Sequence, residues 1–311
     1  MTDIIITEYI DPKALAILEP DFDIHYDQDL WQKPEELASL MPGVPGMIVR
    51  NATQVRGAVL DNADELKCVG RLGVGLDNID MDECGTKDIA VYPATGANSD
   101  SVAELAIGGM FVMLRNAYHA TPSVVDGSWP RMQMMGREVM GKTLGIVGLG
   151  SIGKALAWRA KGLGMTVVAW DPYINADNPQ WEEHGVGFIA TLEELVAAAD
   201  VVSVHVPLTD ETRDMFDAAL IAQMKSDALL FNLARGGIVN ETDLVAALRE
   251  NQIGGAFLDT FEVEPVSADN IFKDVPNLIL APHVGARTVE ADDRVCTMIA
   301  DAVAKHLKAE G

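Results

Sequence analysis

The feature that most constrains this chain is a glycine-rich turn, Gly-Leu-Gly-Ser-Ile-Gly, at residues 148–153. The residues before it, 143–147, are mostly apolar and predict a buried strand, and residues 154–161 after it predict a helix. A G-x-G-x-x-G turn between a strand and a helix is typical of a βαβ unit that binds a dinucleotide. Outside that context the pattern is weak, because glycines also form turns that bind nothing.

The glycines and the next strand give this turn a chemical interpretation. Gly148 permits the tight strand-to-helix turn, Gly150 lets the backbone approach a pyrophosphate, and Gly153 lets the helix pack against the strand. The pyrophosphate is expected at the helix N-terminus, where free N–H groups and the helix dipole favour an anion. The second strand, 166–170, ends at Asp171. This carboxylate is expected to accept a hydrogen bond from a ribose 2′-hydroxyl and to repel a 2′-phosphate, which favours NAD over NADP.

Strand-like and helix-like segments alternate along all 311 residues, which predicts an α/β architecture with parallel sheets. Before residue 98 the predicted strands are 4–7, 22–26, 47–49, 68–70 and 90–92. After residue 142 the sequence predicts six more, at 143–147, 166–170, 201–205, 229–232, 255–258 and 277–280. A last helix over 289–307 is expected to return to the first unit. The expected domains are therefore 1–98 with 285–311, and 99–284.

Composition excludes several classes of partner. The formal net charge is −24, which argues against binding to nucleic acid or to an anionic membrane surface. The acidic residues are spread along the chain, so they predict a heavily solvated surface. A surface of this kind suits a salt-rich habitat, which remains a hypothesis.

The three cysteines and the N-terminus bear on localisation. Cys68, Cys84 and Cys296 are scattered without a CxxC pair, which predicts a reducing compartment and no metal site. The N-terminus begins with a strand-like segment, and the apolar run 105–114 is about half the length of a membrane span. We therefore expect a cytoplasmic protein.

Three polar residues follow consecutive predicted strands of the second unit. Arg235 comes after strand 229–232, Glu264 after the strand that ends at residue 258, and His283 after strand 277–280. Ligands of open α/β sheets bind outside the carboxyl ends of the strands, so we expect the ligand site there, in the crevice between the two units. Arginine can hold a carboxylate, histidine can move a proton at neutral pH, and a carboxylate can fix the histidine tautomer. Taken singly, each residue could instead be a loop ion pair, a solvated turn or a helix cap.

These motifs resemble the D-2-hydroxyacid dehydrogenase family along the whole chain. The segments that carry the resemblance are 48–50, 71–80, 141–145, 148–153, 232–237, 259–265 and 281–286. Within that family the chain is similar to the phosphoglycerate dehydrogenase branch and, through residues 93–98, to the bacterial sulfolactate dehydrogenases. The resemblance implies two doubly wound parallel-sheet domains, with a Rossmann NAD-binding domain inserted into a flavodoxin-like substrate domain.

The resemblance also implies roles for individual residues. His283 is the expected acid/base that protonates the carbonyl oxygen of a 2-oxo acid, Glu264 stabilises its protonated form, and Arg235 clamps the substrate carboxylate. Backbone N–H groups of Val74 and Gly75 are expected to bind that carboxylate from the other domain. The implied NAD site consists of Gly148, Gly150, Ser151, Ile152, Gly153, Asp171, Val206, Leu233, Asp259, His283 and Gly285. Val206 and Leu233 would line the nicotinamide pocket, and Asp259 would bind the carboxamide.

The substrate tail is the least constrained part of this interpretation. Arg50 matches a family arginine that can meet an anionic group on the third carbon, although it could instead form a surface ion pair. The sequence favours (S)-3-sulfolactate or 3-phosphoglycerate as substrate, with hydroxypyruvate or glyoxylate reduction as an alternative. A homodimer is expected because the family uses the region 105–136 as a subunit contact. A second class remains open, because some relatives are NAD-sensing corepressors that need no strong catalysis.

Overall fold

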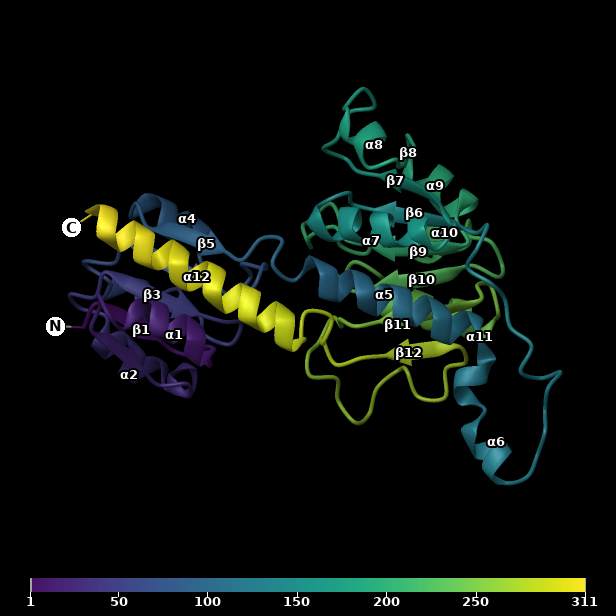
Figure 1. Ribbon diagram of the computed structural model, residues 1–311, viewed down its shortest axis with the longest axis horizontal. Helices are drawn as coiled ribbons and strands as arrows, with labels where there is room; N and C mark the ends of the chain where they lie inside the picture. The colour runs from purple at the N-terminus through teal and green to yellow at the C-terminus, as the bar shows by residue number, and fades with distance from the viewer. Residues whose placement is uncertain (1, 311) are drawn as a thin grey trace. The chain divides into compact units, whose positions relative to one another are not determined.

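The structure, a computed structural model, describes residues 2–310, and the chain divides into two compact units. Unit 1 comprises residues 1–98 and 287–311, and unit 2 comprises residues 99–286 (Figure 1). Each unit contains one fully parallel sheet flanked by helices, so the expected α/β class with two parallel-sheet domains is confirmed.

Unit 1 contains a five-stranded sheet in the order β2-β1-β3-β4-β5. Its strands are β1 (Ile4–Ile6), β2 (Ile24–Tyr26), β3 (Gly46–Val49), β4 (Cys68–Arg71) and β5 (Ala90–Pro93). Its helices are α1 (Pro12–Leu18), the 3₁₀ turn η1 (Leu30–Gln32), α2 (Pro34–Leu40), α3 (Ala58–Asp61), α4 (Met81–Thr86) and α12 (Val289–Glu310).

The helices of unit 1 cover both faces of its sheet. One core cluster joins α1 and α12 to the sheet, and a second joins α2, α3 and α4 to the opposite face. The long helix α12 approaches β4 closely, because a Cβ added to Gly70 would lie 2.5 Å from the Ile299 side chain. Glycine at this strand position therefore permits the C-terminal helix to pack on the first unit (Figure 1).

Unit 2 contains a seven-stranded sheet in the order β12-β11-β10-β9-β6-β7-β8. Its strands are β6 (Thr143–Val147), β7 (Thr166–Trp170), β8 (Gly187–Phe188), β9 (Val201–Val204), β10 (Leu229–Asn232), β11 (Gly255–Leu258) and β12 (Leu278–Leu280). Its helices are α5 (Ser99–Leu114), η2 (Asn116–His119), α6 (Thr121–Val125), α7 (Ser151–Gly162), α8 (Gln180–Glu183), α9 (Leu192–Ala198), α10 (Ala218–Ile221) and α11 (Glu241–Arg249). The sequence predicted six of these strands and missed β8.

The order of the strands in unit 2 creates a switch point between β6 and β9. From β6 the chain runs outward to β7 and β8, and it then returns to β9 and runs the other way to β12. Helices α5 and α7 pack on one face of the sheet, and α9, α10 and α11 pack on the other. A switch point of this kind is where open α/β sheets bind ligands, at the carboxyl ends of the strands.

Side chains that cap the helix N-termini fix where several helices begin. The Thr191 hydroxyl accepts a hydrogen bond from Glu194 N at 3.2 Å and so caps the N-terminus of α9. Asn240 caps α11 in the same way, through a 3.1 Å bond from Asp243 N. Within residues 2–310, no helix is both long and apolar enough to cross a membrane.

Candidate active site and NAD site

The glycine turn connects β6 to α7 in unit 2 and has the geometry that a pyrophosphate needs. Gly148 has a φ of 95°, a backbone conformation that residues with a side chain rarely adopt. A Cβ on Gly153 would lie 2.4 Å from the Gly148 oxygen, so this position also requires glycine. A Cβ on Gly150 would meet nothing within 4 Å, so the space above this residue is open. Ser151 is the first residue of α7, and the predicted ligand Ile152 follows it, so the helix N-terminus faces this turn. The turn fits a dinucleotide.

Asp171 lies directly after β7 and is held by backbone amides. Its Oδ2 accepts a hydrogen bond from Leu149 N at 2.8 Å, and its Oδ1 accepts one from Tyr173 N at 2.9 Å. A carboxylate has about four lone-pair sites, so two remain for ribose hydroxyls. The bond to Leu149 ties the acid to the glycine turn itself.

Val206 and Leu233 follow β9 and β10, the strands on one side of the switch point. Both side chains are buried and belong to the hydrophobic clusters of unit 2. They come from neighbouring strands and lie at the same edge of the sheet as the glycine turn. Apolar side chains at this edge of the sheet suit the binding of a nicotinamide ring.

The structure brings His283 and Glu264 together. Nδ1 of His283 lies 2.8 Å from Oε2 of Glu264, and the other carboxylate oxygen accepts a 3.0 Å hydrogen bond from Phe261 N. Because a carboxylate accepts, Nδ1 carries the hydrogen, and Nε2 is left for a substrate proton. Both side chains remain partly exposed, 47% for His283 and 36% for Glu264, so solvent reaches the pair.

Asp259, at the end of β11, holds the backbone that presents His283. Its two oxygens accept hydrogen bonds from Val284 N at 2.8 Å and Gly285 N at 2.7 Å, and the residue is only 1% exposed. Burial raises the pKa of Asp259, although these two N–H groups oppose the rise. His283 has a φ of 54°, which is uncommon outside glycine, so the loop needs such support. Binding of the carboxamide by Asp259 stays a prediction.

Arg235 lies in a loop that packs against the Glu264 loop. A Cβ on Gly236 would lie 1.8 Å from the Phe261 oxygen, so only glycine allows this approach. Asn232 shapes the same loop, because its Oδ1 accepts from Ala234 N at 3.1 Å and its Nδ2 donates to the Arg235 oxygen at 2.8 Å. Sequence reasoning missed Asn232. Its signal was a polar residue that ends an otherwise apolar strand.

His205 is a second residue that the sequence interpretation missed. It follows β9 directly before Val206, and its Nε2 lies 2.9 Å from the Ser203 hydroxyl. Nδ1 is buried without a hydrogen-bond partner among the described residues. Burial lowers the pKa of His205 to about 4, so the ring is neutral at pH 7. A histidine at the carboxyl end of a central strand was the available signal.

In unit 1, Val74 and Gly75 lie in the loop after β4. Neither backbone N–H donates a hydrogen bond within the described part of the chain, and both residues are partly exposed. Asn78, farther along this loop, donates to the oxygens of Arg50 at 3.1 Å and Thr53 at 2.7 Å. The loop therefore has two free N–H donors, and Asn78 ties it to the segment that follows β3.

Arg50 follows β3 and is buried, with 9% of its side chain exposed. Its Nη2 donates to Asp292 Oδ1 at 2.5 Å, and its Nε donates to the Tyr9 oxygen at 2.9 Å. Burial disfavours the charged form of Arg50, but the hydrogen bond and charge of Asp292 outweigh it and raise the pKa of Arg50. The sequence predicted that Arg50 binds a substrate tail, and the structure pairs it with a carboxylate of its own unit.

Glu8 fixes the backbone around Arg50 and was also missed. Its Oε1 accepts from Arg50 N at 2.9 Å and Thr53 N at 3.0 Å, and its Oε2 accepts from Ala52 N at 3.2 Å. The residue is buried at the carboxyl edge of the sheet. The neighbouring sequence gave no indication of this role, because Glu8 is one acidic residue among many and follows a short strand.

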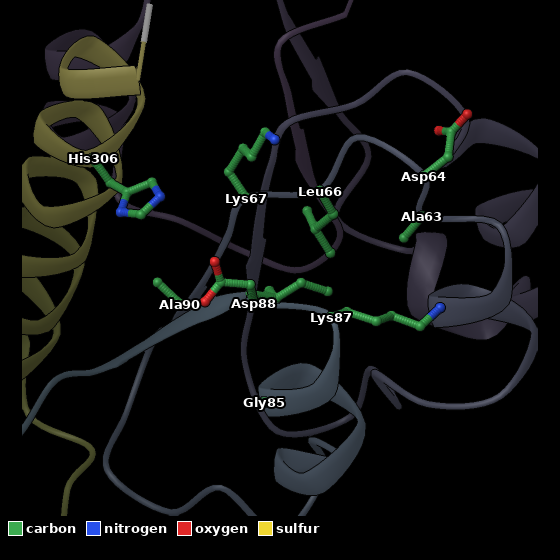
Figure 2. A pocket seen from close by; sticks show the side chains of 10 residues that line it. Ala63, Asp64, Leu66, Lys67, Gly85, Lys87, Asp88, Ala90 and His306 are labelled. Carbon is green, nitrogen blue, oxygen red and sulfur yellow. The ribbon is translucent and has the colours of Figure 1, made fainter.

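A surface pocket of about 640 Å³ lies at the opposite edge of unit 1, at the amino ends of β4 and β5. Figure 2 shows the side chains around it, with His306 of α12 on one side and Lys87 on the other. Lys67 and Asp88 also line it, so its charges are mixed. It lies away from the loops that carry Arg50 and Val74, since carboxyl and amino strand ends face opposite ways in a parallel sheet. Among the described residues there is no acidic, histidine or cysteine cluster that could hold a metal ion.

Comparisons with known proteins identify the family. Residues 107–285 match the D-isomer specific 2-hydroxyacid dehydrogenase NAD binding domain. The chain belongs to this family. It is 46% identical to the (S)-sulfolactate dehydrogenase of Chromohalobacter salexigens, over 99% of each chain. It is 40% identical to the D-3-phosphoglycerate dehydrogenase of Methanocaldococcus jannaschii, over 100% of this chain and 58% of that protein.

The likeness extends to solved structures of 2-hydroxyacid dehydrogenase architecture. The crystal structure of the TT0316 protein from Thermus thermophilus matches with a TM-score of 0.88 at 29% identity, over 99% of this chain and 97% of that one. The family predicted from the sequence is confirmed. The protein is an NAD-dependent 2-hydroxyacid dehydrogenase that acts on a CH–OH group, and the alternative of a corepressor is not favoured.

Proposed function

We propose that this dehydrogenase interconverts a three-carbon 2-hydroxy acid with an anionic tail and the corresponding 2-oxo acid, with 3-sulfolactate ahead of 3-phosphoglycerate. The observation that carries the proposal is Arg50, a buried arginine whose backbone oxygen is bonded to the Val74–Asn78 loop through Asn78. The loop with the free N–H donors thus contacts the residue that carries the cation, and this combination suits a molecule with a carboxylate at one end and a second anion at the other. The similarity to a sulfolactate dehydrogenase points the same way.

His283 is the proposed acid/base. During reduction its Nε2 delivers a proton to the carbonyl oxygen, and the Glu264 carboxylate at Nδ1 stabilises the imidazolium before that transfer. In the oxidative direction Nε2 takes the hydroxyl proton. Arg235 holds the substrate carboxylate, and its loop lies against the Phe261–Glu264 segment.

Bound NAD supplies or accepts the hydride. The residues that would hold it are Gly148, Gly150, Ser151, Ile152, Gly153, Asp171, Val206, Leu233, Asp259, His283 and Gly285. The open space over Gly150 and the two lone pairs left on Asp171 support this assignment. The negative charge of Asp171 disfavours a 2′-phosphate, so the proposed preference is NAD over NADP.

Unit 1 is the proposed substrate-binding domain. The N–H groups of Val74 and Gly75 bind the carboxylate, and Arg50 binds the tail. A neutral tail is the second candidate, because Arg50 already has Asp292 as an anionic partner. That observation favours hydroxypyruvate or glyoxylate as alternative substrates.

A homodimer in a reducing, cytoplasmic compartment completes the proposal. Large apolar side chains are exposed on the segment after α6, where Trp129 and Met132 are each 74% exposed. A groove of about 670 Å³ between α5 and α7 is lined by Ile107, Trp158 and Leu163. Exposed apolar surface of this kind favours association with a second copy. The three cysteines are free and buried, as suits a reducing compartment.

A substrate panel tests the proposed function. NADH oxidation is measured with sulfopyruvate, phosphohydroxypyruvate, hydroxypyruvate and glyoxylate in the wild-type protein and in Arg50→Gln. We expect the anionic tails to give the higher kcat/KM and to lose more of it in Arg50→Gln. Higher kcat/KM for hydroxypyruvate or glyoxylate would refute the substrate class and leave the dehydrogenase assignment intact.

A further inference from the structure

We propose that Asp292 is a specificity-determining residue: by pairing with Arg50 it lets the enzyme accept a tail with one negative charge and reject a dianionic one. The inference rests on the proposed role of Arg50 as the tail ligand. The preference for a sulfonate tail over a phosphate tail then originates in Asp292. This side chain touches neither the carboxylate of the substrate nor its reacting carbon.

The hydrogen bonds of Arg50 leave little of its guanidinium for a ligand. Nε donates to the Tyr9 oxygen, and Nη2 donates to Asp292 Oδ1 and to Cys296 Sγ at 3.4 Å. Within residues 2–310 only Nη1 has no partner. A tail anion therefore meets one nitrogen, not the two parallel N–H donors with which arginine usually grips a phosphate.

Asp292 is well placed to keep this pairing. It lies in the first turn of α12, where the N–H groups and dipole of a 22-residue helix favour a negative charge. Its side chain is 28% exposed, and it meets the buried guanidinium from within the same unit. Removing it from Arg50 would leave a buried cation without an anion, which is costly.

Besides Asp292, the titratable side chains that hydrogen-bond Arg50 are a carboxylate and a thiol. Glu8 is a second buried carboxylate, and it binds the backbone N–H of Arg50. Burial raises the pKa of Cys296, so its thiol is neutral at pH 7 and is no rival anion. Arg294 comes two residues after Asp292 in α12, so it lies on another face of the helix. It is exposed, and its Nε donates a hydrogen bond to the Ala97 oxygen. The Arg50 guanidinium is therefore paired with Asp292, and Glu8 holds the Arg50 backbone.

This charge balance discriminates between tails that have the same shape. A sulfonate carries one negative charge, whereas a phosphate monoester carries about 1.5 to 2 at pH 7. The second phosphate charge finds no partner at Nη1 and is repelled by Asp292. Since the repulsion acts between partly buried groups, it is much stronger than the same pair would feel in water.

The test compares Asp292→Asn with Asp293→Asn. Asp293 lies in the same helix turn and pairs with the exposed Lys13 at 3.2 Å, so its substitution removes the same charge without touching Arg50. We measure kcat/KM with NADH for sulfopyruvate, phosphohydroxypyruvate and hydroxypyruvate. Asp292→Asn is expected to raise the phosphate-to-sulfonate ratio on the order of tenfold, mainly through KM. In Asp293→Asn the ratio should stay within about twofold of wild type.

A pH series on the wild-type protein needs no variant. It separates the effect of the charge of the tail on substrate preference from the effect of the shape of the tail. The second phosphate proton is gained near pH 6, so the phosphate-to-sulfonate ratio should rise as the pH falls through that value. Taking the ratio cancels the titration of groups that both substrates share. A ratio that is flat with pH, or equal in wild type and Asp292→Asn, overturns the inference.

Failure of the inference can be told apart from failure of the proposed function. If Arg50→Gln weakens both anionic substrates but Asp292→Asn leaves their ratio unchanged, Arg50 binds the tail and Asp292 has no part in selectivity. If Arg50→Gln affects sulfopyruvate and hydroxypyruvate equally, the tail does not bind Arg50, and the inference about Asp292 falls with it.

Discussion

Replacing Asp259 by asparagine tests how the histidine loop is held. Both oxygens of this buried carboxylate accept backbone N–H groups, from Val284 and Gly285. Asparagine keeps the shape but replaces one acceptor with an NH₂ group that faces one of these donors. A buried N–H without a partner costs about 1–3 kcal/mol.

That cost translates into measurable changes. For a domain the size of unit 2, each kcal/mol lowers Tm by roughly 2–4 °C, so the Asp259→Asn variant should unfold about 2–12 °C earlier than wild type. His283, with its positive φ, loses its support, and kcat should fall at least tenfold because misplaced catalytic groups act poorly. Calorimetry and NADH-oxidation kinetics measure the two effects.

Asp217→Asn is the matched control. Asp217 caps α10 through one oxygen, at 2.8 Å from Leu220 N, and asparagine caps a helix equally well. Its Tm and kcat should stay near wild type. A Tm for Asp259→Asn within 1 °C of wild type, with unchanged kcat, would refute the idea that Asp259 supports the loop.

Further predictions concern the proton, the cofactor and pH. His283→Ala should lower kcat on the order of 10²–10⁴-fold while NADH still binds in a fluorescence titration; loss of both together would argue for misfolding. Glu264→Gln should lower kcat, because the imidazolium loses a charged partner, and an unchanged kcat speaks against this pairing. Asp171→Ala should reduce the NAD-over-NADP ratio of kcat/KM, which must exceed one in wild type. The pKa of His205, which burial lowers to about 4, lies below the value near 6.5 of an unfolded histidine. The folded protein therefore binds fewer protons in that window, and its free energy of unfolding should fall by about 1–3 kcal/mol as the pH drops from ~6.5 to 4. Urea titrations of His205→Asn should show a smaller fall; equal falls would contradict the assignment.

The sequence predicted the central strands most closely. The bounds of β6, β7, β10 and β11 agree with the predicted segments, because each is a short apolar run that is bounded by glycine or polar residues and packed within the sheet. The strand β8 was missed. It has two residues, both exposed at the edge of the sheet, so no hydrophobic pattern marks it.

The proximity of His283 and Glu264 also followed from the sequence, because parallel strands end at one edge. The supporting contacts did not. Asn232, Glu8 and the pairing of Asp259 with two backbone amides depend on loop conformations that residue type alone does not determine. A buried polar residue must find a hydrogen-bond partner, but sequence gives no partner until the backbone is placed.

Arg50 illustrates the physical reason for this limit. The position after β3 was predictable from the strand pattern, whereas its partner lies 242 residues farther along the chain, on the helix that returns to unit 1. Whether an arginine offers its full charge to a ligand depends on such a distant contact. Local motifs predict only that a cation stands at position 50. In the folded unit, this cation is already paired with the Asp292 carboxylate. On the proposed role of Arg50 as the tail ligand, the difference between those two states separates a phosphate site from a site for a tail of lower charge.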